Sequence, residues 1–179
     1  MKKQLTLLIG GCRSGKSRHA MKLAEACPGT HRVFIATCEP GDEEMRNRVA
    51  RHRIERGDRW QTAEAPLKLA EAVERYGATA DVLLVDCLTL WISNRILQRP
   101  DENKMVAEGE RLTAALVKAT CPVLVVSNEV GTGIVPENAL ARIYRDAVGT
   151  VNRIVAAAAD DVIWMVAGIP VPIKGAAAP

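Results

Sequence analysis

Short apolar runs alternate with longer stretches of helical pattern along this chain. Five runs read as strands, at residues 5–9, 32–37, 82–85, 123–126 and 162–166. Nearly continuous apolar character over so few residues is typical of strands buried on both faces of a parallel sheet. Residues 60–63 are a weaker candidate, for a short edge strand.

Helical patterns fill the segments between these runs. They predict helices at residues 18–26, 42–56, 66–76, 88–98, 102–119 and 136–159. Strands that alternate with helices predict an α/β fold, with a mostly parallel sheet covered by helices on both faces and right-handed connections. We expect one domain over residues 1–179, with a tail from about 170 to 179 that is extended or poorly ordered.

The stretch from Gly10 to Ser17 fits the pattern G-x-x-x-x-G-K-[ST], between the first strand and the first helix. Glycines allow successive N–H groups to point into one concavity, and the helix N-terminus adds positive potential. We expect Lys16 to reach phosphate oxygens and the Ser17 hydroxyl to bind Mg²⁺. The alternative is an ordinary glycine turn. The candidate phosphate-binding residues are Gly10, Gly11, Cys12, Arg13, Ser14, Gly15, Lys16 and Ser17.

Polar residues follow the ends of other strands as well. Asp86 ends an aliphatic run, as in a Walker B segment, where a carboxylate holds Mg²⁺ opposite Ser17. The alternative is a helix N-cap. Because ligands of parallel sheets bind at the carboxyl ends of strands, residues 37–39, 86–87 and 127–129 should meet the phosphate loop in one crevice. The glycines of 128–133 indicate either a ligand contact or an ordinary polar turn.

The segment 42–59 is unusually charged, with acidic residues at its start and basic residues at its end. Such a gradient suits the helix dipole and is typical of a solvated helix. However, Met45, Val49 and His52 fall at i, i+4 and i+7, so His52 lies on the apolar stripe. The residue types leave two interpretations open. His52 either packs, or attacks phosphorus as a neutral imidazole while nearby arginines hold phosphate oxygens.

Composition narrows the class of protein. The chain has 179 residues, a formal net charge of +3 and only 3% aromatic residues. Few aromatics and no basic tail disfavour a RecA-like nucleic-acid motor, and the absence of N-K-x-D disfavours a regulatory GTPase. Five scattered cysteines without a C-x-x-C pair indicate a reducing cytoplasm. No apolar segment reaches 18 residues, so we expect no stable membrane insertion.

Four blocks of sequence together carry a family resemblance. They are residues 10–20, the segments 35–37, 42–53 and 60–64, residues 86–89, and the stretch from Ser127 to Asn152 with Gly168-Ile169-Pro170. In these blocks the chain resembles the bifunctional adenosylcobinamide kinase / adenosylcobinamide-phosphate guanylyltransferase of cobalamin biosynthesis. The most distinctive block reads Ser127-Asn128-Glu129-Val130-Gly131-Thr132-Gly133-Ile134-Val135-Pro136-Glu137-Asn138.

The resemblance implies a RecA-like P-loop NTPase fold, a homotrimer and two Mg²⁺-dependent reactions. A nucleoside triphosphate, GTP or ATP, phosphorylates adenosylcobinamide; GTP then donates GMP to adenosylcobinamide phosphate through a GMP–histidine intermediate. His52 matches the family histidine, and Lys16 is the second catalytic candidate. Besides the phosphate loop, the implied nucleotide contacts are Ala36, Thr37, Cys38, Arg53, Ile54, Glu55, Arg56, Glu64 and Asp86. The competing interpretation is a P-loop small-molecule kinase without the transferase step.

Overall fold

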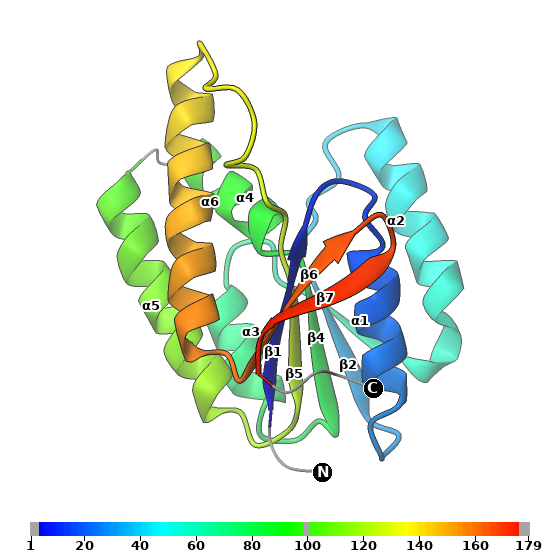
Figure 1. Cartoon of the computed structure of the whole chain (residues 1–179). Coiled ribbons are helices and arrows are strands. Elements are labelled where there is room, and N and C mark those ends of the chain that lie inside the picture. The colour runs from blue at the N-terminus through cyan, green and yellow to red at the C-terminus, as the bar shows by residue number, and fades with distance from the viewer. Residues whose placement is uncertain (1–3, 99–100, 176–179) are drawn as a thin grey trace.

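One seven-stranded sheet organises the structure (Figure 1). The computed structural model describes residues 4–98 and 101–175, apart from the side chains of Glu44, Arg48, Arg51, His52, Glu55 and Glu102. The strands are β1 (Leu5–Gly10), β2 (Arg32–Ala36), β3 (Gln61–Glu64), β4 (Val82–Asp86), β5 (Val123–Val126), β6 (Asp161–Val166) and β7 (Ile169–Lys174). Their order is β3-β2-β4-β5-β1-β6-β7, and every pairing except β6–β7 is parallel.

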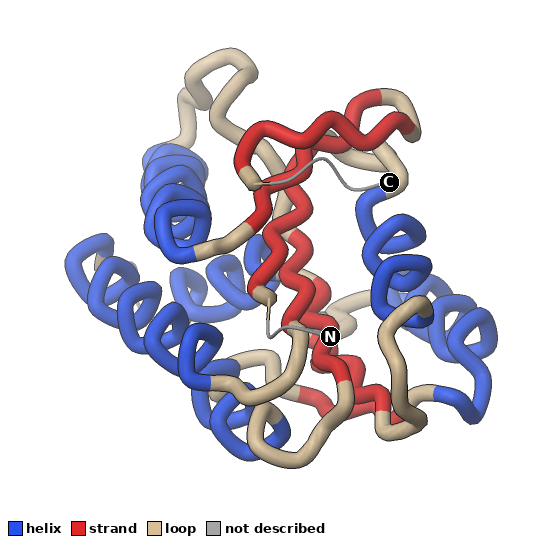
Figure 2. Tube along the Cα trace, turned by 60° about the horizontal axis from the view of Figure 1, so that its bottom comes forward, coloured by secondary structure: helices blue, strands red, loops and turns tan. Residues whose placement is uncertain are grey.

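Helices cover both faces of this sheet, as Figure 2 shows. They are α1 (Lys16–Glu25), α2 (Glu43–Arg56), α3 (Leu69–Tyr76), α4 (Leu88–Gln98), α5 (Glu102–Lys118) and α6 (Ala139–Ala158), with a 3₁₀ turn, η1 (Gly57–Arg59). Alternate strand residues enter opposite cores, because successive side chains point to opposite faces. Leu7 and Ile35 pack in the core beneath α3–α6, whereas Leu8 and Phe34 pack in the core beneath α1. The predicted α/β fold is confirmed.

The apolar pattern of the sequence predicted one of the two edge strands and missed the other. The candidate strand at 60–63 is confirmed as β3, the edge beside β2. At the other edge, the segment expected to be an extended or poorly ordered tail forms β7, antiparallel to β6, as far as Lys174. The sequence pattern did not predict this strand because it contains Pro170 and Pro172, and a proline lacks the N–H of a ladder hydrogen bond. The strand forms nevertheless because prolines are tolerated at a sheet edge. Residues 176–179 lie outside the described residues.

Several helices begin at other residues than the sequence pattern predicts, and capping side chains fix two of the helix starts. Asp42 caps α2 by accepting a bond from the N–H of Met45 at 2.8 Å, as the acidic start of the segment predicts. The last helix begins at Ala139 rather than at Pro136, because the side chain of Asn138 accepts a bond from the N–H of Ala141 at 3.0 Å. The first helix begins at Lys16, inside the glycine motif. The helix expected from residue 66 begins at Leu69.

His31 joins three segments at the amino edge of the sheet. Its Nδ1 lies 3.0 Å from the carbonyl oxygen of Thr79, and its Nε2 lies 2.9 Å from Oε1 of Gln61. Since both partners are oxygen acceptors in this arrangement, the imidazolium, which donates from both nitrogens, satisfies them together. The bond to Gln61 is the largest cause that raises the pKa of His31, followed by the bond to Thr79.

This arrangement predicts a pH-dependent contribution to stability. A pKa raised by folding stabilises the protein fully below the unfolded value, near 6.5, and the contribution disappears as pH rises through the folded value. His31→Ala should therefore lower the midpoint of thermal unfolding most near about pH 5.5 and least near about pH 9. Circular dichroism melts at both pH values measure this. Gln61→Ala is the control, and it should show the same trend more weakly; an equal loss at both pH values would contradict the assignment.

Candidate functional site

The turn between β1 and α1 has the backbone of an anion cradle. Gly10, Arg13 and Gly15 have φ of 155°, 55° and 91°, and Gly15 is the N-cap of α1. Glycine reaches such angles without a steric penalty, whereas Arg13 adopts a left-handed conformation that is uncommon for a side-chain-bearing residue. The chain therefore curls around a concavity that opens onto the N-terminal N–H groups of α1.

Neighbouring strands hold this loop closely. The N–H of Gly168, in the β6–β7 turn, donates to the carbonyl oxygen of Ser14 at 3.1 Å. A Cβ at Gly10 would lie 2.4 Å from the carbonyl oxygen of Met165 in β6, whereas a Cβ at Gly11 would meet nothing within 4 Å. The first glycine of the motif is therefore required for packing against β6, and the second faces open space.

Lys16 turns back into the loop. Its ammonium donates to the carbonyl oxygens of Gly10 at 2.9 Å and Gly11 at 2.6 Å, and the residue is only 7% exposed. Burial lowers the pKa of Lys16, and Cys87 and Asp86 oppose that shift. Burial raises the pKa of Cys87 to about 11, so near pH 7 the negative charge beside Lys16 comes from Asp86. The carboxylate predicted to hold metal is thus close enough to affect the charge of the cation predicted to hold phosphate.

The strand ends meet in one line, as expected. In the sheet register Ala36 pairs with both Glu64 and Asp86, and Asp86 pairs with Val126. The hydroxyl of Thr37 accepts a bond from the N–H of Cys87 at 2.8 Å and donates to its carbonyl oxygen at 2.7 Å. Thr37 is fully buried, and its hydroxyl fastens the end of β2 to the end of β4. Cys38, next in the chain, is partly exposed.

A network of amide and hydroxyl groups fixes the loop after β5, which Figure 1 shows above the sheet beside α6. Ser127 donates to Oδ1 of Asn152 at 2.6 Å, and Nδ2 of Asn152 donates to the carbonyl oxygen of Asn128 at 3.1 Å. The N–H of Glu129 donates to the carbonyl oxygen of Gly10 at 3.0 Å. The loop after β5 is therefore hydrogen-bonded both to α6 and to the phosphate loop. The buried Asn152 belongs to a block that carries the family resemblance, but neither that resemblance nor the helical pattern predicts its hydrogen bonds to this loop.

Helix α2 presents one side to the body of the protein. Met45 and Val49 are partly buried and Arg56 is buried, whereas the other side chains of α2 that the structure describes are exposed, including Ile54 at 80%. The stripe predicted from Met45 and Val49 is confirmed. By helical periodicity, position 52 belongs to this inward side. The side chains of His52 and Glu55 lie outside the described residues.

The two described arginines at the end of α2 differ sharply. Arg53 forms an ion pair with Glu64, at the end of β3, and both side chains are more than half exposed. Arg56 instead places its guanidinium carbon 3.8 Å from the centre of the Phe34 ring. Of the positions predicted to contact nucleotide, Arg53 and Glu64 lie near the line of strand ends and face solvent, while Arg56 packs against the core.

The oxygen donors of the site fit a magnesium ion. Ser17 is in the first turn of α1, and Asp86 is partly exposed at the end of β4, close enough to affect Lys16. Within the described part of the chain, no three side chains among His, Cys, Asp and Glu form a metal-binding group. A hydroxyl and one carboxylate leave most coordination positions to water and phosphate oxygens, which is how Mg²⁺ is usually held.

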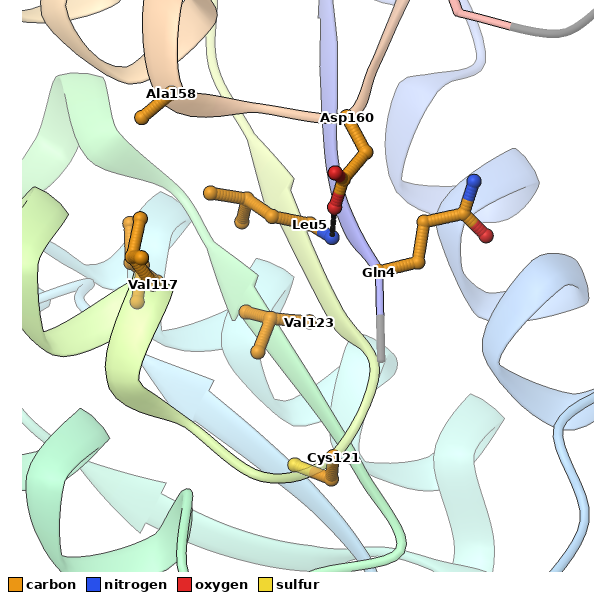
Figure 3. Close-up of a pocket in the computed structure, with 8 residues that line it drawn as sticks. Gln4, Leu5, Val117, Cys121, Val123, Ala158 and Asp160 are labelled. Carbon is orange, nitrogen blue, oxygen red and sulfur yellow. Dashed lines mark hydrogen bonds between the residues drawn. The ribbon is translucent and has the colours of Figure 1, made fainter. Parts of the chain in front are cut away.

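The opposite end of the sheet contains a separate hollow (Figure 3). It has a volume of about 200 Å³ and is lined by Leu5, Val123 and Asp160, among others. The carboxylate of Asp160 is already bonded to the N–H of Leu5 at 2.8 Å. β1 runs from Leu5, at this hollow, to Gly10, in the phosphate loop, and its length is about 17 Å. The hollow therefore does not belong to the phosphate site. In residues 4–98 and 101–175, no helix has the length and apolar content needed to cross a membrane.

Comparison with known proteins agrees with this geometry. The family model described as "Cobinamide kinase / cobinamide phosphate guanyltransferase" matches residues 6–173. The "Bifunctional adenosylcobalamin biosynthesis protein CobP" of Pseudomonas aeruginosa is 42% identical over 169 residues, which cover 94% of this chain and 96% of that protein. The "Bifunctional adenosylcobalamin biosynthesis protein CobU" of Salmonella typhimurium is 40% identical over 95% of this chain and 99% of its own length. The Escherichia coli protein with the same name is 38% identical.

The contact of Gly10 with β6 predicts an asymmetry between the first two glycines of the loop. Gly10→Ala should push the loop away from Met165 and lower the unfolding midpoint by roughly 3–9 °C, as overpacking by about 1–3 kcal/mol does in a chain of this size. Gly11→Ala, the matched control, should leave the midpoint within about 1 °C, since its Cβ meets open space. Thermal melts without nucleotide measure both, and equal losses would contradict the packing role of Gly10.

Proposed function

The chain belongs to the cobinamide kinase / cobinamide phosphate guanyltransferase family, and from this premise we propose that one phosphate loop serves both reactions. In the first, GTP or ATP phosphorylates the hydroxyl of adenosylcobinamide. In the second, GTP donates GMP to adenosylcobinamide phosphate, giving adenosylcobinamide-GDP and pyrophosphate. The observation that carries the proposal is the buried Lys16 ammonium, bonded to the carbonyl oxygens of Gly10 and Gly11 beside the α1 N-terminus.

In the kinase step the loop binds and neutralises the triphosphate. Lys16 exchanges the carbonyl oxygens of Gly10 and Gly11 for phosphate oxygens, which carry full negative charge and accept stronger bonds. Ser17 and Asp86 are the proposed ligands of Mg²⁺, which when bound supplies positive charge against the phosphate oxygens. Phosphoryl transfer depends mainly on such positioning and charge stabilisation, so these residues suffice without a covalent intermediate on the protein.

In the transferase step we assign the nucleophile to His52. A neutral imidazole nitrogen attacks the α-phosphorus of GTP; the N–P bond forms as the bond to pyrophosphate breaks. A phosphate oxygen of adenosylcobinamide phosphate then attacks the same phosphorus, and the N–P bond breaks to release the histidine. The inward side of α2, marked by Met45, Val49 and Arg56, supports this assignment, because position 52 shares it.

We also propose nucleotide contacts along the strand ends and at the end of α2. The register that aligns Ala36, Glu64 and Asp86 supports one continuous binding edge, and Arg53 reaches it through its ion pair with Glu64. The full set is Ala36, Thr37, Cys38, Arg53, Ile54, Glu55, Arg56, Glu64 and Asp86, with Gly10 to Ser17. Ile54 is mostly exposed, so it would contribute apolar contact to a ligand that arrives from solvent.

A homotrimer in the cytoplasm completes the proposal. Trp164 pairs with Val171 and Val166 pairs with Ile169, so these residues share one face of the β6–β7 hairpin, where all four are exposed. An apolar face on an edge strand is usually covered by another chain, which supports subunit contact here. None of the five cysteines forms a disulfide bond, which supports a reducing compartment. Sedimentation equilibrium measures the oligomeric state.

The covalent step is tested with GTP labelled at the α-phosphate. The wild-type protein with Mg²⁺ should acquire acid-labile label, and His52→Ala should acquire none while it still converts adenosylcobinamide to its phosphate. The other two histidines provide matched controls: His19→Ala and His31→Ala should both take up label.

Product analysis separates the proposal from a kinase that lacks the transferase step. A kinase alone stops at adenosylcobinamide phosphate and carries no label. If His52→Ala is labelled as rapidly as the wild type, the histidine assignment is wrong. If the wild type forms adenosylcobinamide phosphate but never the GDP product, the transferase reaction itself is wrong.

A further inference from the structure

An aromatic cluster lies beneath the end of α2, in a chain with few aromatic residues. The sequence contains one phenylalanine, Phe34, and three tryptophans. Phe34 and Trp60 are both buried and meet edge to face, with ring centres 6.3 Å apart and planes at 87°. The guanidinium of Arg56 lies over the Phe34 ring, 3.8 Å from its centre. The last turn of α2 is thus joined to β2 and to the residue that follows η1.

This contact is better shielded from water than the ion pairs of the same region. The Arg53–Glu64 pair is 53% and 65% exposed, and the Arg59–Glu25 pair is 67% and 34% exposed at 3.5 Å. Exposed ion pairs contribute little, because water screens them and both side chains lose entropy. Arg56 is only 5% exposed, and a desolvated cation–π contact is at the upper end of its range. Of these three contacts, we therefore expect the Arg56–Phe34 contact to contribute most to the attachment of the helix end.

The Arg56–Phe34 contact is close enough to position 52 along α2 to set where that part of the helix lies. Position 52 lies one turn before Arg56, about 6 Å along the axis and on the same side of the helix. After Arg56 the helix ends at Gly57, whose φ is 59°, and the chain continues through η1 to β3. A nucleophile must lie about 3–3.5 Å from the atom it attacks, and an error of about 1 Å costs roughly a hundredfold in rate.

The kinase step depends on other elements. Gly10, Lys16 and Asp86 lie on β1, α1 and β4, and the bonds that fix Lys16 are made to the loop itself. A small change in the direction of α2 leaves these contacts in place. The aromatic cluster is therefore expected to influence the two reactions unequally.

We propose that Phe34 is a positioning residue for guanylyl transfer: its ring holds the Arg56 guanidinium and so fixes the end of the helix that carries His52. This inference rests on the proposed function, because it takes His52 as the nucleophile. Phe34 itself is only 5% exposed, with the Arg56 guanidinium over its ring. Its ring acts through Arg56, and its effect is confined to the reaction that uses α2.

Phe34→Leu tests this directly, since leucine keeps most of the buried apolar volume but offers no π face. In single-turnover experiments with α-labelled GTP, the variant should label about tenfold more slowly than the wild type, the loss expected for one desolvated cation–π contact. Its kinase rate at saturating GTP should stay within about twofold. Phe34→Tyr restores the ring and should restore the labelling rate.

Ile35→Val is the matched control, because Ile35 is the adjacent buried residue of β2 but packs in the core on the opposite face. It should change neither rate by more than about twofold. Three results would overturn the inference: unchanged labelling in Phe34→Leu, equal loss of both reactions in that variant, or equal loss in Ile35→Val. Absence of label in the wild-type protein is a different result, since it removes the histidine intermediate itself and with it the proposed transferase mechanism.

Discussion

The rest of the site depends on how closely the phosphate loop packs against its neighbours. Gly10 approaches the carbonyl oxygen of Met165 so closely that no side chain fits, and Gly168 donates a hydrogen bond to Ser14 from the same hairpin. These contacts hold the loop in a curl that the backbone would not adopt alone, with Arg13 in a left-handed conformation. A loop held in this way needs little rearrangement when a triphosphate arrives, which is the main requirement of electrostatic catalysis.

The same scaffold explains how one small fold serves two transfers. The parallel register brings the ends of β2, β3, β4 and β5 to one edge, next to the loop after β1. Lys16 and Asp86 stay with the core of the sheet, whereas the proposed nucleophile is on α2, at the outer edge of the fold beyond α1 (Figure 1). Phosphate binding and nucleophilic attack are thus assigned to different layers. A change in the outer helix therefore affects guanylyl transfer while the phosphate loop continues to bind its ligand.

Several of these features were predictable from the sequence. The apolar runs and the G-x-x-x-x-G-K-[ST] motif predict the parallel sheet, the phosphate loop and Lys16, because each depends on local pattern and chain order. The stripe of Met45 and Val49 predicts the inward side of α2, and the structure confirms it. The roles proposed for His52 and the nucleotide contacts come from the family resemblance and remain predictions.

Other features depend on contacts between distant residues, which the pattern does not encode. The sequence predicts a nucleotide contact for Arg56 but not its stacking on Phe34, 22 positions earlier in the chain. It likewise predicts a ligand contact for Thr37 but not the two hydrogen bonds between its hydroxyl and the backbone of Cys87. The strand β7 was hidden by its prolines. In each case the feature depends on tertiary packing that the local pattern does not encode.

The central claim is that one phosphate loop serves both reactions, and Lys16→Met tests it most directly because it removes the ammonium but keeps an unbranched side chain of similar length. Single-turnover rates of adenosylcobinamide phosphate formation and of histidine labelling should be measured on the same preparation. We predict that both fall by about a hundredfold or more, as expected when a preorganised charge partner of the reacting phosphates is lost. If either reaction continues at the wild-type rate, the two transfers do not share the loop, and the account is wrong.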